Sequence, residues 1–555
     1  MSREYSVKAR TTLTDPGLSV TRFARRPRTP GNVGLALGGG GSRAASASMG
    51  VVRALHHFGL LRHVRAISSV SGGSWFAVPF TFLPDHFDEH EFLGEYLADP
   101  SELRWDVDGS LSAGNFGVPL TRLGMSLPAI VGEALRDTFE GAPADRLWTR
   151  QIGEQLLGHF DLAHFDADHH PSDFFAADET MANIIRMANP QLDHRCHLIR
   201  QSEAMPRPFL IVNGAMRVDG PTGAEVLAPV QFTPWFSGVM GSQIGTLDQL
   251  EVGGGGVSSY AFGGRWEAGT RERPLLAQRN PLALSDIAGI SSAAYSETAG
   301  DKGLELLCPT LDYFSPLWPA NRTARARFVD AGSLENTGIA NLLAYEDIDR
   351  VIALISAGRP FQHIAGEKIV ARQIAALFGF REYDVLEGGY RRYSQTGSGN
   401  PDFAGNQIFA SDKGEFEALV ARMSALHDAG EPIVVEQDLE LVRNDKFAIR
   451  GGRRVRVLWI LLSPAKRWTA QIDLAGARLE LDAPVLRHAA GRDVELGQDL
   501  EARHHRGVQL HRALLDDAQR AVDAVADHDG VLGGLEVDVA GPLGERARDD
   551  RVDDV

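Results

Sequence analysis

Cysteine is scarce in this sequence, since Cys196 and Cys308 are the only two among 555 residues. Two cysteines exclude a disulfide framework and a cysteine-rich zinc site, although a single bridge between them stays open. Long apolar runs are missing as well. No stretch of about 18 uncharged apolar residues occurs, which argues against a transmembrane helix, and the N-terminus lacks the apolar core of a secretory signal. We therefore expect a cytoplasmic or peripheral membrane protein.

Positive charge is also in deficit: 56 Lys and Arg residues face 73 Asp and Glu residues, which gives a net charge of -17. This balance disfavours a broad nucleic-acid interface, so we expect no nucleic-acid partner. The apolar fraction of 43% is ordinary for a globular protein with a sizeable core. The length predicts either several domains or one large domain with insertions.

The two ends of the chain differ in composition from its middle. Residues 1–30 are polar, and we expect a solvated basic arm, with weak anchoring to acidic lipid as the alternative. Its basic cluster comprises Arg22, Arg25, Arg26 and Arg28. Residues 469–555 contain neither aromatic residues nor lysine. This composition predicts an appendage of uncertain order, and it also fits a shifted reading frame in a GC-rich gene.

Two motifs near the N-terminus carry chemistry. The apolar run 33–37 is followed by the glycines 38–41 and a segment of helical composition, which together predict a strand, a glycine loop and a helix. Backbone N–H groups at such a helix start can hold a developing oxyanion. A second apolar run, 64–70, ends at Ser71 among small residues. A sharp turn after a strand exposes a serine as a nucleophile, so Ser71 is the candidate.

A third motif lies much later in the sequence. Residues 327–332 read as a short strand that ends at Asp330 in a turn of small residues, and a helix at 339–345 and a strand at 351–356 follow. This order favours a parallel layer with Asp330 at the carboxyl end of its strand, where such sheets bind ligands. We therefore predict an α/β fold, with a mainly parallel central sheet and helices on both faces.

Weaker patterns add further expectations. We predict strands at 209–213, 231–235 and 455–462, and an amphipathic helix at 364–378. One polar cluster resembles a set of metal ligands and comprises Asp166, Asp168, His169, His170 and Asp173. Its spacing matches no defined metal site, so we interpret it as a solvated loop and expect neither a metal nor a cofactor.

The three motifs read LALGGGGSRAASASMGVVRALHHFGLL, SVSGGSW and FVDAGSLENTGIANLL. In this order they resemble the patatin-like phospholipase superfamily, and within it the cytosolic phospholipase A2 and lysophospholipase branch. Segments 232–238 and 289–296 are weaker echoes of the same family. The resemblance implies a catalytic domain at 31–468, with a cap or lid insertion at about 84–326. Only a short arm precedes Val33, so we do not carry over the calcium recruitment of some relatives.

The resemblance also implies roles for single residues. Ser71 would be the nucleophile and Asp330 its base, in a pair that uses no histidine. The oxyanion and substrate-binding groups would be Gly40, Gly41, Arg43 and Gly72, with Arg43 holding the substrate phosphate or stabilising the charged intermediate. Ser69, where the family has glycine, and Pro79, which predicts a late or kinked helix after Ser71, depart from the pattern.

The activity that this resemblance implies is hydrolysis of phospholipid or lysophospholipid acyl esters, with transient contact to a membrane surface. Acyl transfer through the same acyl-serine is one alternative. A catalytically inactive lipid-binding protein is the second, favoured by Ser69 and Pro79. A nucleotide-binding module is disfavoured, because Arg43 stands where a third glycine is needed. The oligomeric state stays open.

Overall fold

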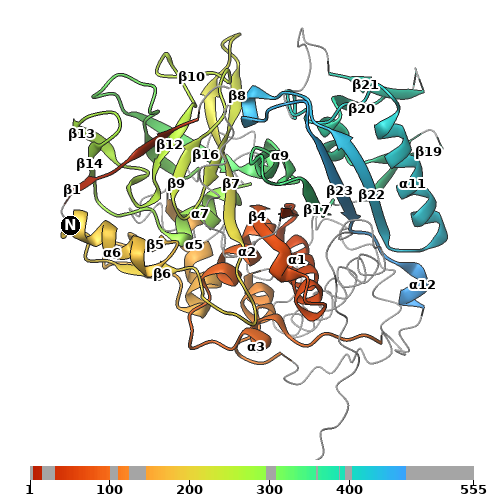
Figure 1. Cartoon of the computed structure of the whole chain (residues 1–555), viewed down its shortest axis with the longest axis horizontal. Helices are drawn as coiled ribbons and strands as arrows, with labels where there is room; N and C mark the ends of the chain where they lie inside the picture. Colours follow the sequence, from red (N-terminus) through yellow and green to blue (C-terminus); the bar gives the residue numbers. More distant parts are fainter. Residues whose placement is uncertain are drawn as a thin grey trace, which may run out of the picture.

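The computed structural model describes residues 4–14, 32–99, 111–123, 146–294, 308–357, 360–364, 366–384, 386, 388–393 and 403–470. Its main feature is a 14-stranded sheet (Figure 1). No helix among the described residues is long and apolar enough to cross a bilayer. The tail 469–555 lies outside the described residues except for its first two positions, as does the arginine cluster of the predicted arm.

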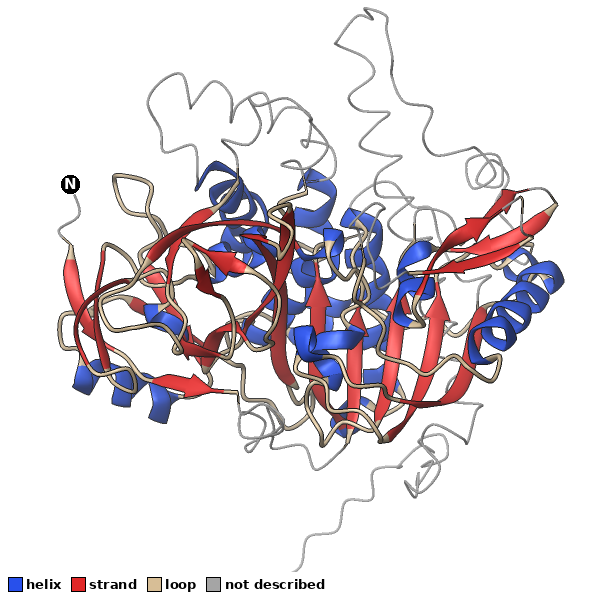
Figure 2. Cartoon of the chain, turned by 90° about the horizontal axis from the view of Figure 1, so that it is seen from above, coloured by secondary structure: helices blue, strands red, loops and turns tan. Residues whose placement is uncertain are grey.

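Five parallel strands form the centre of the sheet, and Figure 2 shows them side by side. Their order is β7 (Phe209–Asp219), β4 (Val64–Val70), β3 (Val33–Leu37), β17 (Arg350–Ile355) and β23 (Arg454–Leu461). Every residue of β3 is buried, as expected for a parallel strand covered on both faces. The predicted fold class is confirmed.

Antiparallel strands extend this centre on both sides. On one side β22 (Ile433–Glu440) pairs with β23; on the other, β8 (Glu225–Phe232), β9 (Phe236–Val239), β12 (Gly255–Ser258) and β2 (Thr11–Leu13) follow β7. The remaining strands are β1 (Tyr5–Lys8), β5 (Asp173–Ala176), β6 (Arg195–Leu198), β10 (Thr246–Leu247), β11 (Leu250–Glu251), β13 (Arg265–Gly269), β14 (Pro274–Gln278), β15 (Thr310–Tyr313), β16 (Ala324–Asp330), β18 (Phe361–Ile364), β19 (Glu367–Val370), β20 (Phe380–Asp384) and β21 (Gly389–Arg392).

Helices cover both faces of the sheet, and the alternation of β3 shows why. Leu35 and Leu37 belong to one hydrophobic core and Ala36 to another, because successive side chains of a strand point to opposite faces. The first core includes α1 (Gly41–His57), α2 (Gly72–Phe82) and α7 (Leu284–Ser291). The second includes α9 (Ile339–Leu343), α10 (Arg372–Leu377) and α11 (Glu415–Ala429). Other helices are α3 (Glu89–Leu93), α5 (Leu147–Ile152), α6 (Glu179–Ala188) and α12 (Lys466–Thr469).

The predicted cap insertion at 84–326 needs a correction. Strands β7, β8, β9 and β12 come from this span, yet they lie in the central sheet itself. The reason is that β7 pairs in parallel with β4 along residues 66–70, which makes it a core strand. A lid role for other parts of the span stays a prediction.

Two further predictions differ from the structure. The prediction of one helix at 364–378 is wrong. Strands β18 and β19 form a hairpin that occupies the first part of this range, and only α10 is helical. Gly366, with φ of 87°, lies between the two strands of that hairpin, in a left-handed conformation that a helix does not use. The solvated arm expected at residues 1–30 also needs a correction. Its described residues form β1, which pairs with β14, and β2, which pairs with β12.

Candidate active site

The register of three strands brings the second and third sequence motifs together. Strand β4 ends at Val70, which lies opposite Asn213 of β7. The next residue of β7, Gly214, is paired with Asp330 of β16. Because β8 occupies the other edge of β7 at this point, β16 continues on the side where β4 stops. The residue after Val70 therefore lies beside Asp330.

This arrangement corrects one expectation. Strand β16 runs antiparallel to β7, so the motif around Asp330 does not belong to a parallel layer. The aspartate still reaches the carboxyl end of β4, since β16 enters from the opposite direction and ends there.

Ser71 and Asp330 are in direct contact. The Ser71 hydroxyl donates a hydrogen bond of 2.8 Å to Asp330 Oδ2. The other carboxylate oxygen, Oδ1, accepts a bond of 2.6 Å from the Gly332 N–H, which fixes the orientation of the carboxylate. Both side chains are sheltered, as Ser71 is 8% and Asp330 4% exposed. A hydroxyl and a carboxylate held in this way can exchange a proton without an intervening water.

Ser71 occupies a strained backbone conformation. Its φ of 49° and ψ of -119° are unusual for a residue with a Cβ and cost about 1–3 kcal/mol. Helix α2 begins directly after it, at Gly72, so the turn from strand to helix is as sharp as predicted. The Ser71 N–H donates to the carbonyl oxygen of Ser291 at 3.1 Å and to its hydroxyl at 3.0 Å. These contacts from α7 hold the strained turn in place.

A chain of serine hydroxyls supports the same turn. Ser291 Oγ lies 2.8 Å from Ser74 Oγ, which donates to Ser69 Oγ at 2.9 Å. Ser69, which replaces the expected glycine, is therefore accommodated as a buried, hydrogen-bonded residue. The late start expected from Pro79 is wrong, because α2 begins at Gly72 and contains the proline. Sequence reasoning missed Ser291, and the weak echo at 289–296 is the signal that could have found it.

The glycine loop packs against the turn at Ser71. A Cβ on Gly72 would lie 2.0 Å from the Gly41 carbonyl oxygen, and one on Gly39 would lie 3.0 Å from Ser71 Cβ. The loop is anchored by the Gly38 N–H, which donates to Leu354 O at 3.0 Å. The Gly39 N–H donates in the same way to Asn336 O at 3.0 Å, just after the Asp330 turn.

The next two N–H groups of the loop differ from these. Gly40 and Gly41 have φ values of 148° and 64°, which favour glycine. Their N–H groups have no hydrogen-bond acceptor within the described part of the chain. Such groups at the start of α1 are available to a negatively charged oxygen.

Arg43 lies in the first turn of α1 and is half-buried. Its guanidinium donates to Ser356 Oγ at 3.2 Å and to Ser356 O at 3.1 Å. Burial lowers the pKa of Arg43, but a guanidinium stays charged at neutral pH. These bonds hold the Arg43 guanidinium beside Ser356, the residue that follows β17. Arg43 itself lies in the first turn of α1, directly after the glycine loop.

No histidine among the described residues forms a hydrogen bond with Ser71. The polar cluster of the sequence forms a tight surface hairpin, in which Asp166 Oδ1 accepts the N–H groups of Asp168 and His170 at 2.9 Å. Asp173 is the exception among these residues, because its side chain is buried at the start of β5.

Comparison with known proteins gives one match to a family. Residues 35–194 match the family model described as patatin-like phospholipase, a range that includes Ser71 and ends before Asp330. No curated protein sequence matches the chain.

Solved structures similar to this chain are distant. The human GIVD cytosolic phospholipase A2 is 14% identical, with a TM-score of 0.40, and the match covers 91% of this chain and 61% of that one. The same enzyme with methyl gamma-linolenyl fluorophosphonate is 15% identical (TM-score 0.34; 92% and 62% covered). VipD from Legionella pneumophila is 11% identical (TM-score 0.20; 67% and 57% covered). The chain spans about three fifths of the length of these proteins. The family match over residues 35–194 includes the first two motifs and agrees with the family that the motifs predicted.

Proposed function

We propose that this protein is a serine acyl hydrolase that cleaves fatty-acyl esters of glycerophospholipids or lysophospholipids. The observation that carries the proposal is the 2.8 Å hydrogen bond from Ser71 to Asp330, made at a strained turn beside a glycine loop. The patatin-like domain supports lipid acyl hydrolysis in general. The Ser71–Asp330 pair and the oxyanion site are our assignments.

In the first step, Ser71 Oγ attacks the ester carbonyl while Asp330 Oδ2 takes its proton. An aspartate in water has a pKa near 4 and is a weak base for a hydroxyl. The pair works only if the two groups are in contact and the negative charge moves to a stabilised site. We assign that site to the N–H groups of Gly40 and Gly41, since removal of one such donor typically slows a reaction about 10²–10³-fold.

In the second half of the reaction, the tetrahedral intermediate collapses and the C–O bond to the leaving alcohol breaks. Asp330 gives its proton to that alcohol, which leaves as a lysophospholipid or a glycerophosphate derivative. Water then attacks the acyl-Ser71 ester while Asp330 accepts one of its protons. The bond between the acyl carbon and Ser71 Oγ breaks, Asp330 returns the proton to Oγ, and the fatty acid is released. An acceptor alcohol in place of water would give acyl transfer. We assign to Arg43 the attraction of the lipid phosphate.

The test measures fatty acid released from mixed phospholipid vesicles. We expect the wild type to release fatty acid, and Ser71→Ala and Asp330→Asn to lose the activity with unchanged circular dichroism. The matched control is Asp248→Asn, an exposed aspartate in a left-handed turn position that asparagine tolerates. Equal release by wild type and Ser71→Ala would refute the mechanism.

A fluorophosphonate probe separates an enzyme from an inactive lipid-binding protein. It should label Ser71 in the folded wild type and leave Ser71→Ala unlabelled. A folded wild type without any label would support the inactive alternative. Adding an acceptor alcohol to the vesicle assay and analysing the products distinguishes hydrolysis from acyl transfer.

A further inference from the structure

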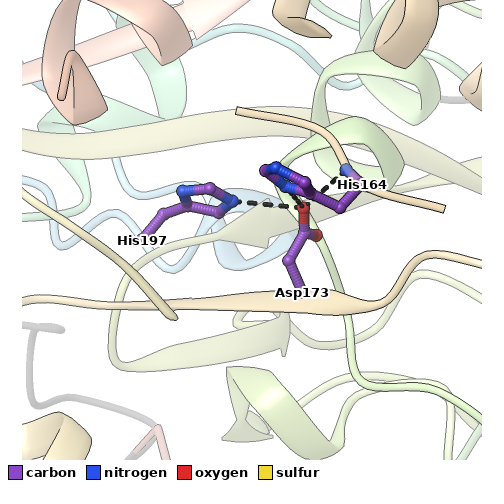
Figure 3. A group of neighbouring side chains, drawn as sticks. All are labelled: His164, Asp173 and His197. Atoms are coloured by element: carbon purple, nitrogen blue, oxygen red, sulfur yellow. Dashed lines mark hydrogen bonds and ion pairs between the residues drawn. The ribbon is translucent and has the colours of Figure 1, made fainter. Parts of the chain in front are cut away.

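We propose that His164, Asp173 and His197 form a binding site for a divalent cation, suited to Zn²⁺ and separate from the Ser71 site. Figure 3 shows both imidazole rings directed toward the same carboxylate. Asp173 opens β5 and His197 lies on β6, which pairs with β5 in a two-stranded parallel sheet. His164 lies just before β5, at the base of the surface hairpin 164–172.

The ligand spacing is close to that of a zinc site. Asp173 Oδ2 lies 3.2 Å from His164 Nδ1 and 3.1 Å from His197 Nε2. In a tetrahedral zinc site with bonds of about 2.0–2.1 Å, neighbouring ligand atoms are about 3.3 Å apart. All three ligand atoms lie within 4.8 Å of one another. Zinc binding would bring the two nitrogens to about 3.3 Å from each other, which requires His164, whose side chain is 30% exposed, to move.

The backbone holds these ligands in place. The His164 N–H donates to Asp173 Oδ2 at 2.9 Å, and the Ser172 N–H donates to His164 O at 2.9 Å, which closes the base of the hairpin. Cys196 is not a fourth ligand, because adjacent residues of a strand point to opposite faces.

A second carboxylate supports His164 in the way that metal-bound histidines are supported. His164 Nε2 lies 2.9 Å from Asp161 Oδ1, which leaves Nδ1 to face Asp173. A ligating histidine almost always donates its other N–H to such a partner, and this fixes both the tautomer and the ring orientation. Arg195 forms an ion pair with Asp161, and its guanidinium also lies 2.8 Å from His164 Nε2.

An unpartnered buried atom points independently to a missing ligand. The Asp173 side chain is 1% exposed, and its Oδ1 has no hydrogen-bond partner among the described residues. Buried polar atoms without partners are rare, and an unseen ion is one of their few explanations. A cation bound by both oxygens of the Asp173 carboxylate would satisfy Oδ1 as well as Oδ2.

The ligand types select the cation. Two imidazoles and a carboxylate suit Zn²⁺, whereas Mg²⁺ and Ca²⁺ prefer sites made of oxygen ligands. Water can take the fourth position from the exposed side of His164. Bound zinc would fasten the hairpin 164–172 to β6 and so stabilise this part of the protein.

The experiment uses the full-length chain without an affinity tag, stripped of metal with a chelator and titrated calorimetrically with ZnCl₂. We expect one Zn²⁺ per chain, a raised melting temperature, and no comparable binding of Mg²⁺. His197→Asn should weaken zinc binding at least 100-fold. The matched control is His169→Asn, which removes an exposed imidazole from the same hairpin at a left-handed position and should bind zinc like the wild type.

Folding of each variant is checked by circular dichroism. If His197→Asn does not fold, His164→Gln replaces it. His164 is only half-buried, so its substitution should disturb the packing less, and the same loss of zinc binding is expected. Cobalt substitution gives a second readout, since tetrahedral nitrogen and oxygen ligation produces visible absorption bands. The proposal is overturned if the folded wild type binds no zinc, or if the control variant loses binding as strongly as the ligand variants. None of these measurements depends on lipid hydrolysis.

Discussion

At the residue scale, close backbone contact explains why several site positions are glycine. Gly72 follows the candidate nucleophile and packs on Gly41 so closely that no side chain fits between them. The N–H groups of Gly40 and Gly41, which we assign to the oxyanion site, belong to the loop that makes this contact. A change in one glycine therefore acts on the position of these donors as well as on local packing.

We expect Gly72→Ala to lower acyl hydrolysis about 10²–10³-fold, the cost of misplacing an oxyanion donor. The added Cβ would lie 2.0 Å from Gly41 O, so the glycine loop must move. Turnover on phospholipid vesicles and the melting temperature measure this. Gly389→Ala is the control, because a Cβ there meets no atom within 4 Å. Full activity of Gly72→Ala would contradict the assigned contact.

Lys446 gives a pH prediction at the same scale. Its ammonium donates to Ala404 O and Asn406 Oδ1 at 3.1 Å, and burial lowers its pKa from 10.5 to about 7. Between these values the unfolded chain binds a proton that the folded protein does not bind. The contribution of Lys446 to the free energy of unfolding therefore rises with pH from about 7 to 10.5 and is lost as pH falls through that window.

The measurement is urea unfolding of wild type and Lys446→Met at several pH values between 7 and 10. We expect the wild type to gain stability relative to the variant as pH rises. Lys413→Met, at an exposed lysine, should track the wild type at every pH. A stability difference between wild type and Lys446→Met that does not change with pH would show that the folded pKa is unshifted.

At the element scale, α7 acts on the turn between β4 and α2. Its last residue, Ser291, accepts the Ser71 N–H through both its carbonyl and its hydroxyl oxygen. The hydroxyl also bonds Ser74 in the first turn of α2. Helix α7, which is distant in sequence from β4 and α2, thus shares one hydrogen-bond network with them around the strained residue.

We expect Ser291→Ala to slow fluorophosphonate labelling of Ser71 about fivefold, since one buried hydrogen bond contributes roughly 1 kcal/mol. The carbonyl contact remains, so the fold should be retained. Ser285→Ala, a buried serine in the same helix, is the matched control and should label at the wild-type rate. Equal labelling of all three proteins would mean that the Ser291 hydroxyl does not position Ser71.

At the scale of the whole molecule, the N-terminal strands β1 and β2 belong to the sheets of the folded protein. Strand β1 pairs with β14, and β2 forms the edge of the large sheet beside β12. Val7 of β1 is fully buried in the main hydrophobic core. The first described residues are therefore part of the folded unit.

We expect Val7→Asp to destabilise the protein by roughly 2–4 kcal/mol, because it buries an unpaired charge. Denaturant unfolding measures the loss. The control is Lys8→Ala, since Lys8 is the exposed neighbour on the same strand. Unchanged stability of Val7→Asp would indicate that β1 detaches from the body in solution.

The sequence by itself determined the parts whose physics is local. Glycines before a helix, a serine after an apolar strand and an aspartate in a small-residue turn each need a specific backbone shape, and that need is visible in a few adjacent residues. Ser71 and Asp330 could therefore be selected from local patterns, whereas the choice of Gly40 and Gly41 within the glycine loop came from the family resemblance. The parallel centre also followed from strongly apolar runs such as β3 and β17.

The tertiary structure decided what depends on pairing between distant segments. Only the register of β7 shows that Asp330 enters on an antiparallel strand and still meets Ser71. Ser291 lies in a segment with only a weak family echo and His197 in a segment with none, so their contacts appear only when α7 and β6 are in place. A hydrogen bond or a metal site joins positions that are far apart along the chain, and the geometry that joins them is set by packing of the whole molecule.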